Sequence, residues 1–266
     1  MINRRWAVAG LALAAAFAVA TAGCNTAPDS EPGAATSPTA AATPKDALLA
    51  SVKDLRTTPF KAQGTLSGGV AVESAIDPVA KAGTHTMSLS IPQIDMSLTA
   101  EQITIGSDVY AKIAVKNFTD PRVKSLPKGW MKVDLAKIKK PEDFTLDDPD
   151  PANLESRLFP GLSTVERSGD RGFKGTLDLT KGTGSGIVDE ETVTALKEKA
   201  SAVPFEATVD DKGRISTFKI LVPAVGSDEA ETWQVTYSAY GTPVTVTKPA
   251  NVVPAPDVVY SAFFNA

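Results

Sequence analysis

Beyond residue 43 the chain changes from a helical to a strand-like spacing of its hydrophobic residues. The helical set is Leu48, Leu49, Val52 and Leu55. It follows Thr43-Pro44-Lys45-Asp46, where a hydroxyl residue, a proline at the first helical position and an acid three residues on are typical of a helix start. The pattern predicts a first helix that ends before Pro59.

Apolar and polar residues then alternate, which is the period of a strand with one buried face. Alternation is clearest over 87–91, 94–98 and 103–113. Two hairpin turns are predicted, at Gly106-Ser107-Asp108 and at Asp210-Asp211-Lys212-Gly213, because glycine tolerates a positive φ. Later strands are predicted at Met131–Leu135, Phe173–Leu179, Phe205–Val209, Ile215–Val222, Trp233–Tyr240 and Val244–Thr247.

Two more helices are predicted among these strands. Asp150-Pro151 begins a short one that carries Leu154 and Leu158, and residues 186–200 form a longer one. Many hairpin-linked strands with few helices indicate an α+β architecture with a large antiparallel sheet. The helices are too few to cover both faces, so we expect one face to meet water.

The N-terminal residues have the order of an export signal. Arg4 and Arg5 are followed by an apolar run, Trp6 to Ala20, and then by Thr21-Ala22-Gly23 before Cys24. A cysteine at this point resembles a bacterial lipobox, whose thiol is acylated and becomes the first mature residue. The resemblance implies a lipid-anchored protein on the outer, extracytoplasmic face of the cell membrane. An uncleaved anchor and plain secretion are the alternatives, and both the general secretory and the twin-arginine routes stay open.

The next segment has the composition of a disordered tether. Residues 25–42 are Ala, Thr, Pro, Ser and Gly with two acids and no aromatic residue. A flexible chain of roughly 18 residues has a root-mean-square reach of about 25 Å. The predicted organisation is therefore a signal peptide at 1–23, an acylated cysteine and tether at 24–42, and one folded domain at 43–266.

The composition and charge of the chain argue against several classes of function. The formal charge is −4, and loss of Arg4 and Arg5 with the signal takes it to −6, that is −4 minus 2. A nucleic-acid-binding protein needs clustered cations, so no nucleic-acid partner is expected. One cysteine and one histidine cannot form an internal disulfide or a zinc or redox-metal cluster. We expect no cofactor.

Catalytic motifs are also missing. His85 is the only imidazole in the chain and no Gly-x-Ser-x-Gly elbow exists, so we expect no enzyme and interpret His85 as a surface strand residue. Gly182-Thr183-Gly184-Ser185-Gly186 lies where a phosphate loop would sit, but no parallel crossover follows, which favours a flexible loop. Asp143, Asp147, Asp148 and Asp150 are close together in one predicted loop, and their spacing lacks the calcium-loop pattern, which favours a solvated turn over a calcium site.

A series of segments in the folded part resembles a known family. They are Gly106–Lys112, Gly129–Asp134, Phe173–Leu179, Val203-Pro204-Phe205, Asp211–Arg214, Tyr237–Val244 and Lys248-Pro249. Together, across Thr43 to Ala266, they resemble the actinobacterial lipoproteins of the LppX/LprG type, within the larger group of LolA/LolB-like lipoprotein carriers. The resemblance implies a strongly curved antiparallel half-barrel with a few helices on its concave side, enclosing an apolar cavity. It also implies binding of lipid or lipoglycan acyl chains and their transport or localisation across the envelope.

The cavity lining is predicted from alternation on the strands and from one helix. The expected residues are Met87, Leu89, Ile91, Ile94, Met96 and Leu98, with Val193 and Leu196 closing the cavity. Methionine suits irregular apolar surfaces and ligands. The competing interpretation is a filled core, in which case the protein would be an envelope scaffold or sensor and not a carrier. The sequence leaves the identity of the lipid, of any envelope transporter partner and of the oligomeric state open.

We expect Cys24 to carry the membrane anchor. Cys24→Ala should release or mislocalise the protein, because two acyl chains anchor a protein stably where one is marginal. Mass spectrometry of the native N-terminus measures this. Detection of residues 1–23 still attached to an unmodified Cys24 would contradict the prediction.

Overall fold

The computed structural model describes residues 42–118, 121–147, 150, 152–181, 190–225 and 229–265, with only the backbone for 67, 121 and 122. The predicted signal, Cys24 and the tether up to residue 41 lie outside the described residues. So do Gly182–Gly186 and Asp148. None of the helices within the described ranges is long and apolar enough to cross a membrane.

The predicted first helix is confirmed as α1, Pro44–Ser51. The Asp46 backbone N–H donates to Thr43 Oγ1 at 3.1 Å, and the Thr43 N–H donates to Asp46 Oδ2 at 3.3 Å. This reciprocal capping box satisfies donors that the first turn leaves unpaired. A 3₁₀ turn, Lys53–Arg56, continues the segment and places Leu55 in the core.

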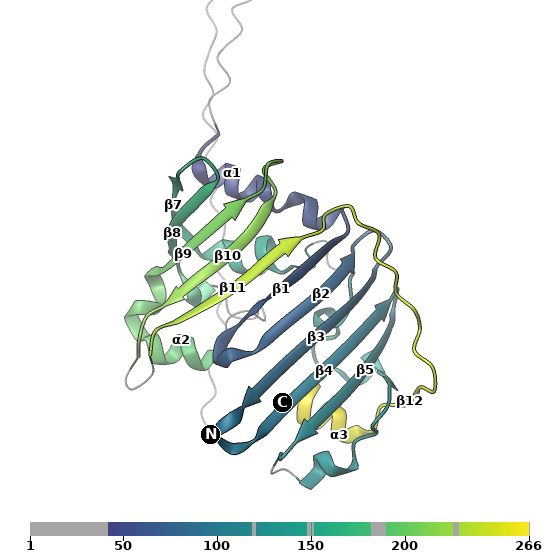
Figure 1. Ribbon diagram of the computed structural model, residues 1–266. Coiled ribbons are helices and arrows are strands. Elements are labelled where there is room, and N and C mark those ends of the chain that lie inside the picture. The colour runs from purple at the N-terminus through teal and green to yellow at the C-terminus, as the bar shows by residue number, and fades with distance from the viewer. Residues whose placement is uncertain are drawn as a thin grey trace, which may run out of the picture. The chain divides into compact units, whose positions relative to one another are not determined.

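The described strands form one open, mostly antiparallel sheet (Figure 1). Their order across it is β12-β6-β5-β4-β3-β2-β1-β11-β10-β9-β8-β7, and only β12 and β6 pair in parallel. The strands are β1 (Phe60–Thr65), β2 (Ala71–Asp77), β3 (Ala82–Ile91), β4 (Met96–Ile105), β5 (Asp108–Lys116), β6 (Met131–Lys132), β7 (Leu162–Ser168), β8 (Gly172–Leu177), β9 (Val203–Val209), β10 (Ile215–Val222), β11 (Glu231–Ser238) and β12 (Val253–Pro254). The expected α+β class with a large antiparallel sheet is confirmed.

Alternation along the strands separates a covered inner face from an outer face that meets water. In β9, Val203, Phe205 and Ala207 are buried, while Glu206 and Thr208 between and after them are exposed. Residues opposite each other on neighbouring strands share a face. The inner side chains of each strand therefore continue those of the next.

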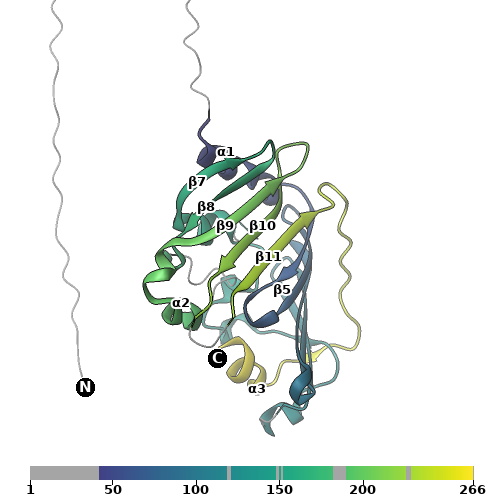
Figure 2. The same ribbon diagram turned by 60° about the vertical axis from the view of Figure 1, so that its left-hand side comes forward.

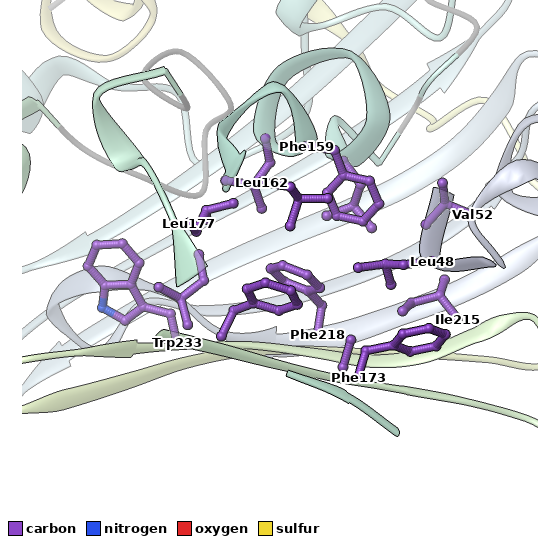
Figure 3. Packing of buried hydrophobic residues seen from close by; sticks show 14 of the residues in the cluster. Leu48, Val52, Phe159, Leu162, Phe173, Leu177, Ile215, Phe218 and Trp233 are labelled. Carbon is purple, nitrogen blue, oxygen red and sulfur yellow. The ribbon is translucent and has the colours of Figure 1, made fainter. Parts of the chain in front are cut away.

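Helical segments on the inner face create a first core. They are α1, the π-helical turn Leu154–Leu158, the 3₁₀ turn Phe159–Gly161, α2 (Glu190–Leu196) and the 3₁₀ turn Lys197–Ala202. Figure 3 shows Leu48 and Phe159 above the sheet, facing Phe218 and Phe173. Phe218 lies 5.4 Å from Phe205 and 5.5 Å from Phe159, measured between ring centroids. This core covers β1 and β7–β11.

A second core lies at the other end of the sheet. Val109, Ala111 and Ile113 of β5 and Met131 of β6 pack there with Val259 and Tyr260. The last two residues belong to α3 (Asp257–Val259) and to the π-helical turn Tyr260–Phe264. In Figure 1, α3 (yellow) lies behind β4 and β5. The inner face thus has two separate cores.

Two predicted strands are wrong in whole or in part. Residues 242–249 form no strand and run as an extended segment from β11 toward β12 (Figures 1 and 2). Pro243 and Pro249 lie near the two ends of this segment and cannot donate to a ladder. The predicted strand Met131–Leu135 pairs only at Met131–Lys132, because Asp134 accepts from the Ala136 N–H at 3.1 Å and starts a 3₁₀ turn.

Strands β1, β2 and β7 and the two-residue β12 were not predicted. The inner faces of β1 and β2 include Ala62, Gly64 and Ser74, so the contrast between apolar and polar positions there is weak. Their place in the sheet comes from pairing with stronger neighbours.

Phe218 and Lys219 are adjacent on β10, and their substitution tests whether one side chain lies on the covered inner face and the other on the outer face. Phe218→Ala should lower the free energy of unfolding by about 3–5 kcal/mol, because Phe218 is 3% exposed and joins the two ring contacts of the first core. Its neighbour Lys219 has its side chain on the outer face, and Lys219→Ala should change stability by less than about 0.5 kcal/mol. Urea denaturation measures both, and equal losses would contradict the assignment of faces.

Candidate functional site

Between the two cores, part of the inner face is only half-covered. Leu89 lies opposite Leu98, and Ile91 lies opposite Met96, so their side chains share one face. Each residue of this patch is part-buried or exposed, and Met87 is 40% exposed. We name it the open apolar face, and it consists of Met87, Leu89, Ile91, Met96, Leu98, Ala100 and Val115.

The open apolar face borders the second core on one side. Leu98, Ala100 and Val115 pack against that core. On the other side the row continues from Met87 through Val72 and Gly64 to Val235. Val235 lines a small pocket together with Leu154 and Trp233, and the pocket has room for about one water molecule. An acyl chain does not fit this pocket, so the open apolar face is the better candidate.

The structure brings together five of the eight residues that were predicted to line a cavity. Met87, Leu89, Ile91, Met96 and Leu98 lie on the open apolar face. Ile94 is in the tight turn Pro92–Ile94 between β3 and β4, where it is 61% exposed.

The helix that was expected to close the cavity packs elsewhere. Leu196 is 2% exposed within the first core, and Val193 packs against the same core. The 3₁₀ turn that continues α2 leads into β9 and contacts β8, which keeps these side chains at the β8–β9 part of the sheet. Val193 and Leu196 therefore do not join the five strand residues.

A polar row runs across the inner face next to the open apolar face. Ser74, His85 and Gln102 lie opposite one another on β2, β3 and β4. The Ser74 Oγ and His85 Nδ1 atoms are 2.6 Å apart and share a hydrogen bond. Gln102 Nε2 donates to Thr104 Oγ1 and to the Phe144 carbonyl, each at 3.1 Å. The row therefore places polar groups inside an apolar surface.

His85, interpreted from the sequence as a surface strand residue, is part-buried on the inner face. Its side chain points inward and is part-buried, and this burial lowers the pKa of its imidazole. His85 lies two residues before Met87, so the alternation that placed Met87, Leu89 and Ile91 on one face already includes it. The sequence alone therefore indicates the side of the sheet on which His85 lies.

The inner face of β1–β5 carries no Lys, Arg, Asp or Glu side chain. Its residues are Phe60, Ala62, Gly64, Val72, Ser74, Ile76, Gly83, His85, Met87, Leu89, Ile91, Met96, Leu98, Ala100, Gln102, Thr104, Val109, Ala111, Ile113 and Val115. The outer face of the same strands holds charges, such as Lys112, whose Nζ lies 2.8 Å from Glu101 Oε1. A charged ligand group on this part of the inner face would lack a countercharge from these strands.

The acidic segment at 143–150 is engaged in protein contacts. Asp143 pairs with Arg157 at 2.6 Å and Asp147 with Lys81 at 2.5 Å. Asp150 accepts from the Ser156 N–H at 2.7 Å. Within the ranges that the structure describes, no group of three His, Cys, Asp or Glu residues is arranged to hold a metal ion. Each of these three carboxylates therefore has a protein partner.

Comparison with protein-family models, with curated proteins and with solved structures finds no match for the chain.

His85 should make stability depend on pH. Its folded pKa lies below the ordinary value of 6.5, so the unfolded chain binds more protons just below pH 6.5 and stability falls as the pH drops. In His85→Gln this contribution is removed, and the loss of unfolding free energy between pH 8 and pH 5 should be smaller. Urea denaturation at both values measures it. An identical loss in both proteins would contradict the burial of a neutral imidazole.

Proposed function

We propose that the open apolar face binds the acyl part of a lipid or glycolipid, and that the protein is an acylated envelope lipoprotein that assists the transport or localisation of that lipid. The observation that carries this proposal is an uncharged, half-exposed aliphatic and methionine surface between two closed cores. A chain with two well-packed cores gains nothing in stability from leaving Met87 uncovered. Exposed apolar surface of this kind marks a binding site in many proteins.

Desolvation supplies the binding energy. Each methylene group removed from water contributes about 0.8 kcal/mol, so one acyl chain offers useful affinity after the costs of association. The face offers branched aliphatic side chains and two flexible methionines, Met87 and Met96, which adapt to irregular chains. The ligand would lie along β3 and β4, which supply six of the seven residues of the open apolar face.

The finer architecture and the anchor belong to the same proposal. The segments that resemble the LppX/LprG type support a strongly curved half-barrel whose helices pack on the concave side around an apolar cavity. The lipobox-like Gly23-Cys24 supports a lipid anchor at the outer face of the cell membrane. A tether of residues 24–42 would let the domain reach the bilayer while it stays anchored.

A scaffold or sensor is the second candidate function. The contacts of Leu98, Ala100 and Val115 with the second core favour it, since they already cover part of the open apolar face. A filled inner face would leave no space for a ligand.

A tryptophan substitution on the open apolar face distinguishes a lipid carrier from a scaffold or sensor. Met87→Trp should leave the thermal midpoint nearly unchanged and weaken the binding of a fluorescent fatty acid, because the indole occupies half-exposed space. Ser88→Trp is the matched control, since Ser88 lies on the outer face of the same strand, and binding should persist. If the face is a filled core, Met87→Trp should cost about 1–3 kcal/mol of stability.

Destabilisation by Met87→Trp together with no fatty-acid binding by the unmutated protein would contradict the carrier function. Native mass spectrometry of the purified protein provides an independent measurement, in which a co-purified lipid is expected.

A further inference from the structure

The polar row offers hydrogen-bonding groups beside the open apolar face, and binding of hydrocarbon does not use them. His85 precedes Met87 by two residues on β3, and Gln102 follows Ala100 by two residues on β4. The polar row is therefore the immediate neighbour of the open apolar face, on the same side of the sheet. A ligand chain that lies across Met87 brings its next atoms over His85.

The geometry leaves one nitrogen of His85 available to a ligand. The hydrogen bond between Ser74 Oγ and His85 Nδ1, 2.6 Å long, restrains the ring. No partner for Nε2 occurs among the described side chains and backbone groups. A neutral imidazole has one N–H and one acceptor nitrogen, and when the Ser74 hydroxyl donates to Nδ1, Nε2 carries the N–H. The site then offers a single hydrogen-bond donor beside an apolar surface.

The lack of charged side chains around His85 on these strands determines which kind of hydrogen-bond acceptor it can bind. Burial keeps the pKa of His85 low, so the imidazole is neutral near pH 7. No cationic side chain lies on the inner face of β1–β5 to balance a carboxylate or a phosphate. A neutral oxygen acceptor avoids the cost of burying an unpaired charge.

We propose that Ser74 and His85 form a recognition site for an uncharged carbonyl oxygen, of an ester or an amide, in the ligand whose hydrocarbon lies on the open apolar face. His85 Nε2 donates to the carbonyl, and Ser74 is the positioning residue that fixes the ring. The inference rests on the proposed function. It adds that the site binds an acyl ester in preference to a bare hydrocarbon and to a carboxylate. Any charged headgroup stays beyond this part of the sheet.

The single histidine makes the test direct. Because His85 is the only histidine in the chain, its ring nitrogens give unambiguous NMR signals. Methyl hexadecanoate should shift the Nε2 signal and fix the tautomer protonated at Nε2, while hexadecane should leave the tautomer unchanged. This measurement uses the unmutated protein, so it does not depend on whether a variant folds.

Affinity gives the second readout, from displacement of a fluorescent fatty acid. The unmutated protein should bind methyl hexadecanoate about tenfold more tightly than hexadecane, as expected for one buried neutral hydrogen bond. His85→Phe should bind both equally, and Ser74→Ala should retain part of the preference with a mixed tautomer. Thr86→Ala, on the outer face of β3, is the control and should behave as the unmutated protein.

The outcomes separate the two proposals. Binding of both probes with no preference and no Nε2 shift would overturn the recognition site and leave the lipid-binding function standing. A preference for hexadecanoate over its methyl ester would also overturn it, because it would require a charge partner. Binding of neither probe would contradict the proposed function and, with it, the recognition site.

Discussion

The pairing of β1 with β11 is the interaction on which the rest of the structure depends. It joins β2–β6 with β7–β10, so that strands from opposite ends of the folded part meet in the middle of one sheet. Gly64 makes the pairing possible, since a Cβ there would strike the carbonyl group of Gln234 on β11. Without this contact the two halves would each have an unpaired edge that could pair with another chain. The close approach explains why a residue with poor strand propensity occupies the sheet interior.

The same junction explains why the inner face has two cores. The helical turns that precede β7 and follow β8, together with α1, cover the β7–β11 half, while the C-terminal α3 covers β5 and β6. Near the junction the inner side chains are small, as at Ala62, Gly64 and Ser74. The half-covered patch that contains Met87 lies between the two cores, so the candidate site depends on how the cores divide the inner face.

Charge divides the two faces as sharply as hydrophobicity does. Ion pairs such as Lys112 with Glu101 lie on the outer face, where water screens them, and they add little stability. On the inner face of β1–β5 the only titratable side chain that can change its charge near neutral pH is His85, and it is hydrogen-bonded to Ser74. For the lipid ligand that we propose, such a surface would favour hydrocarbon by desolvation and would offer an attached polar atom a neutral hydrogen bond.

The sequence by itself determined the local features of this protein. The cap at Thr43, the turns at Gly106 and Gly213, and strand β10 at Ile215–Val222 followed from short-range chemistry and alternation, and the α+β class followed from their sum. Alternation also placed the strand residues from Met87 to Leu98 on one face. Only the tertiary structure decided which elements meet. It paired β1 with β11, put Val193 and Leu196 in the first core, and placed His85 beside Ser74. Contacts between residues far apart in the chain depend on the packing of the whole sheet, and no local pattern encodes them.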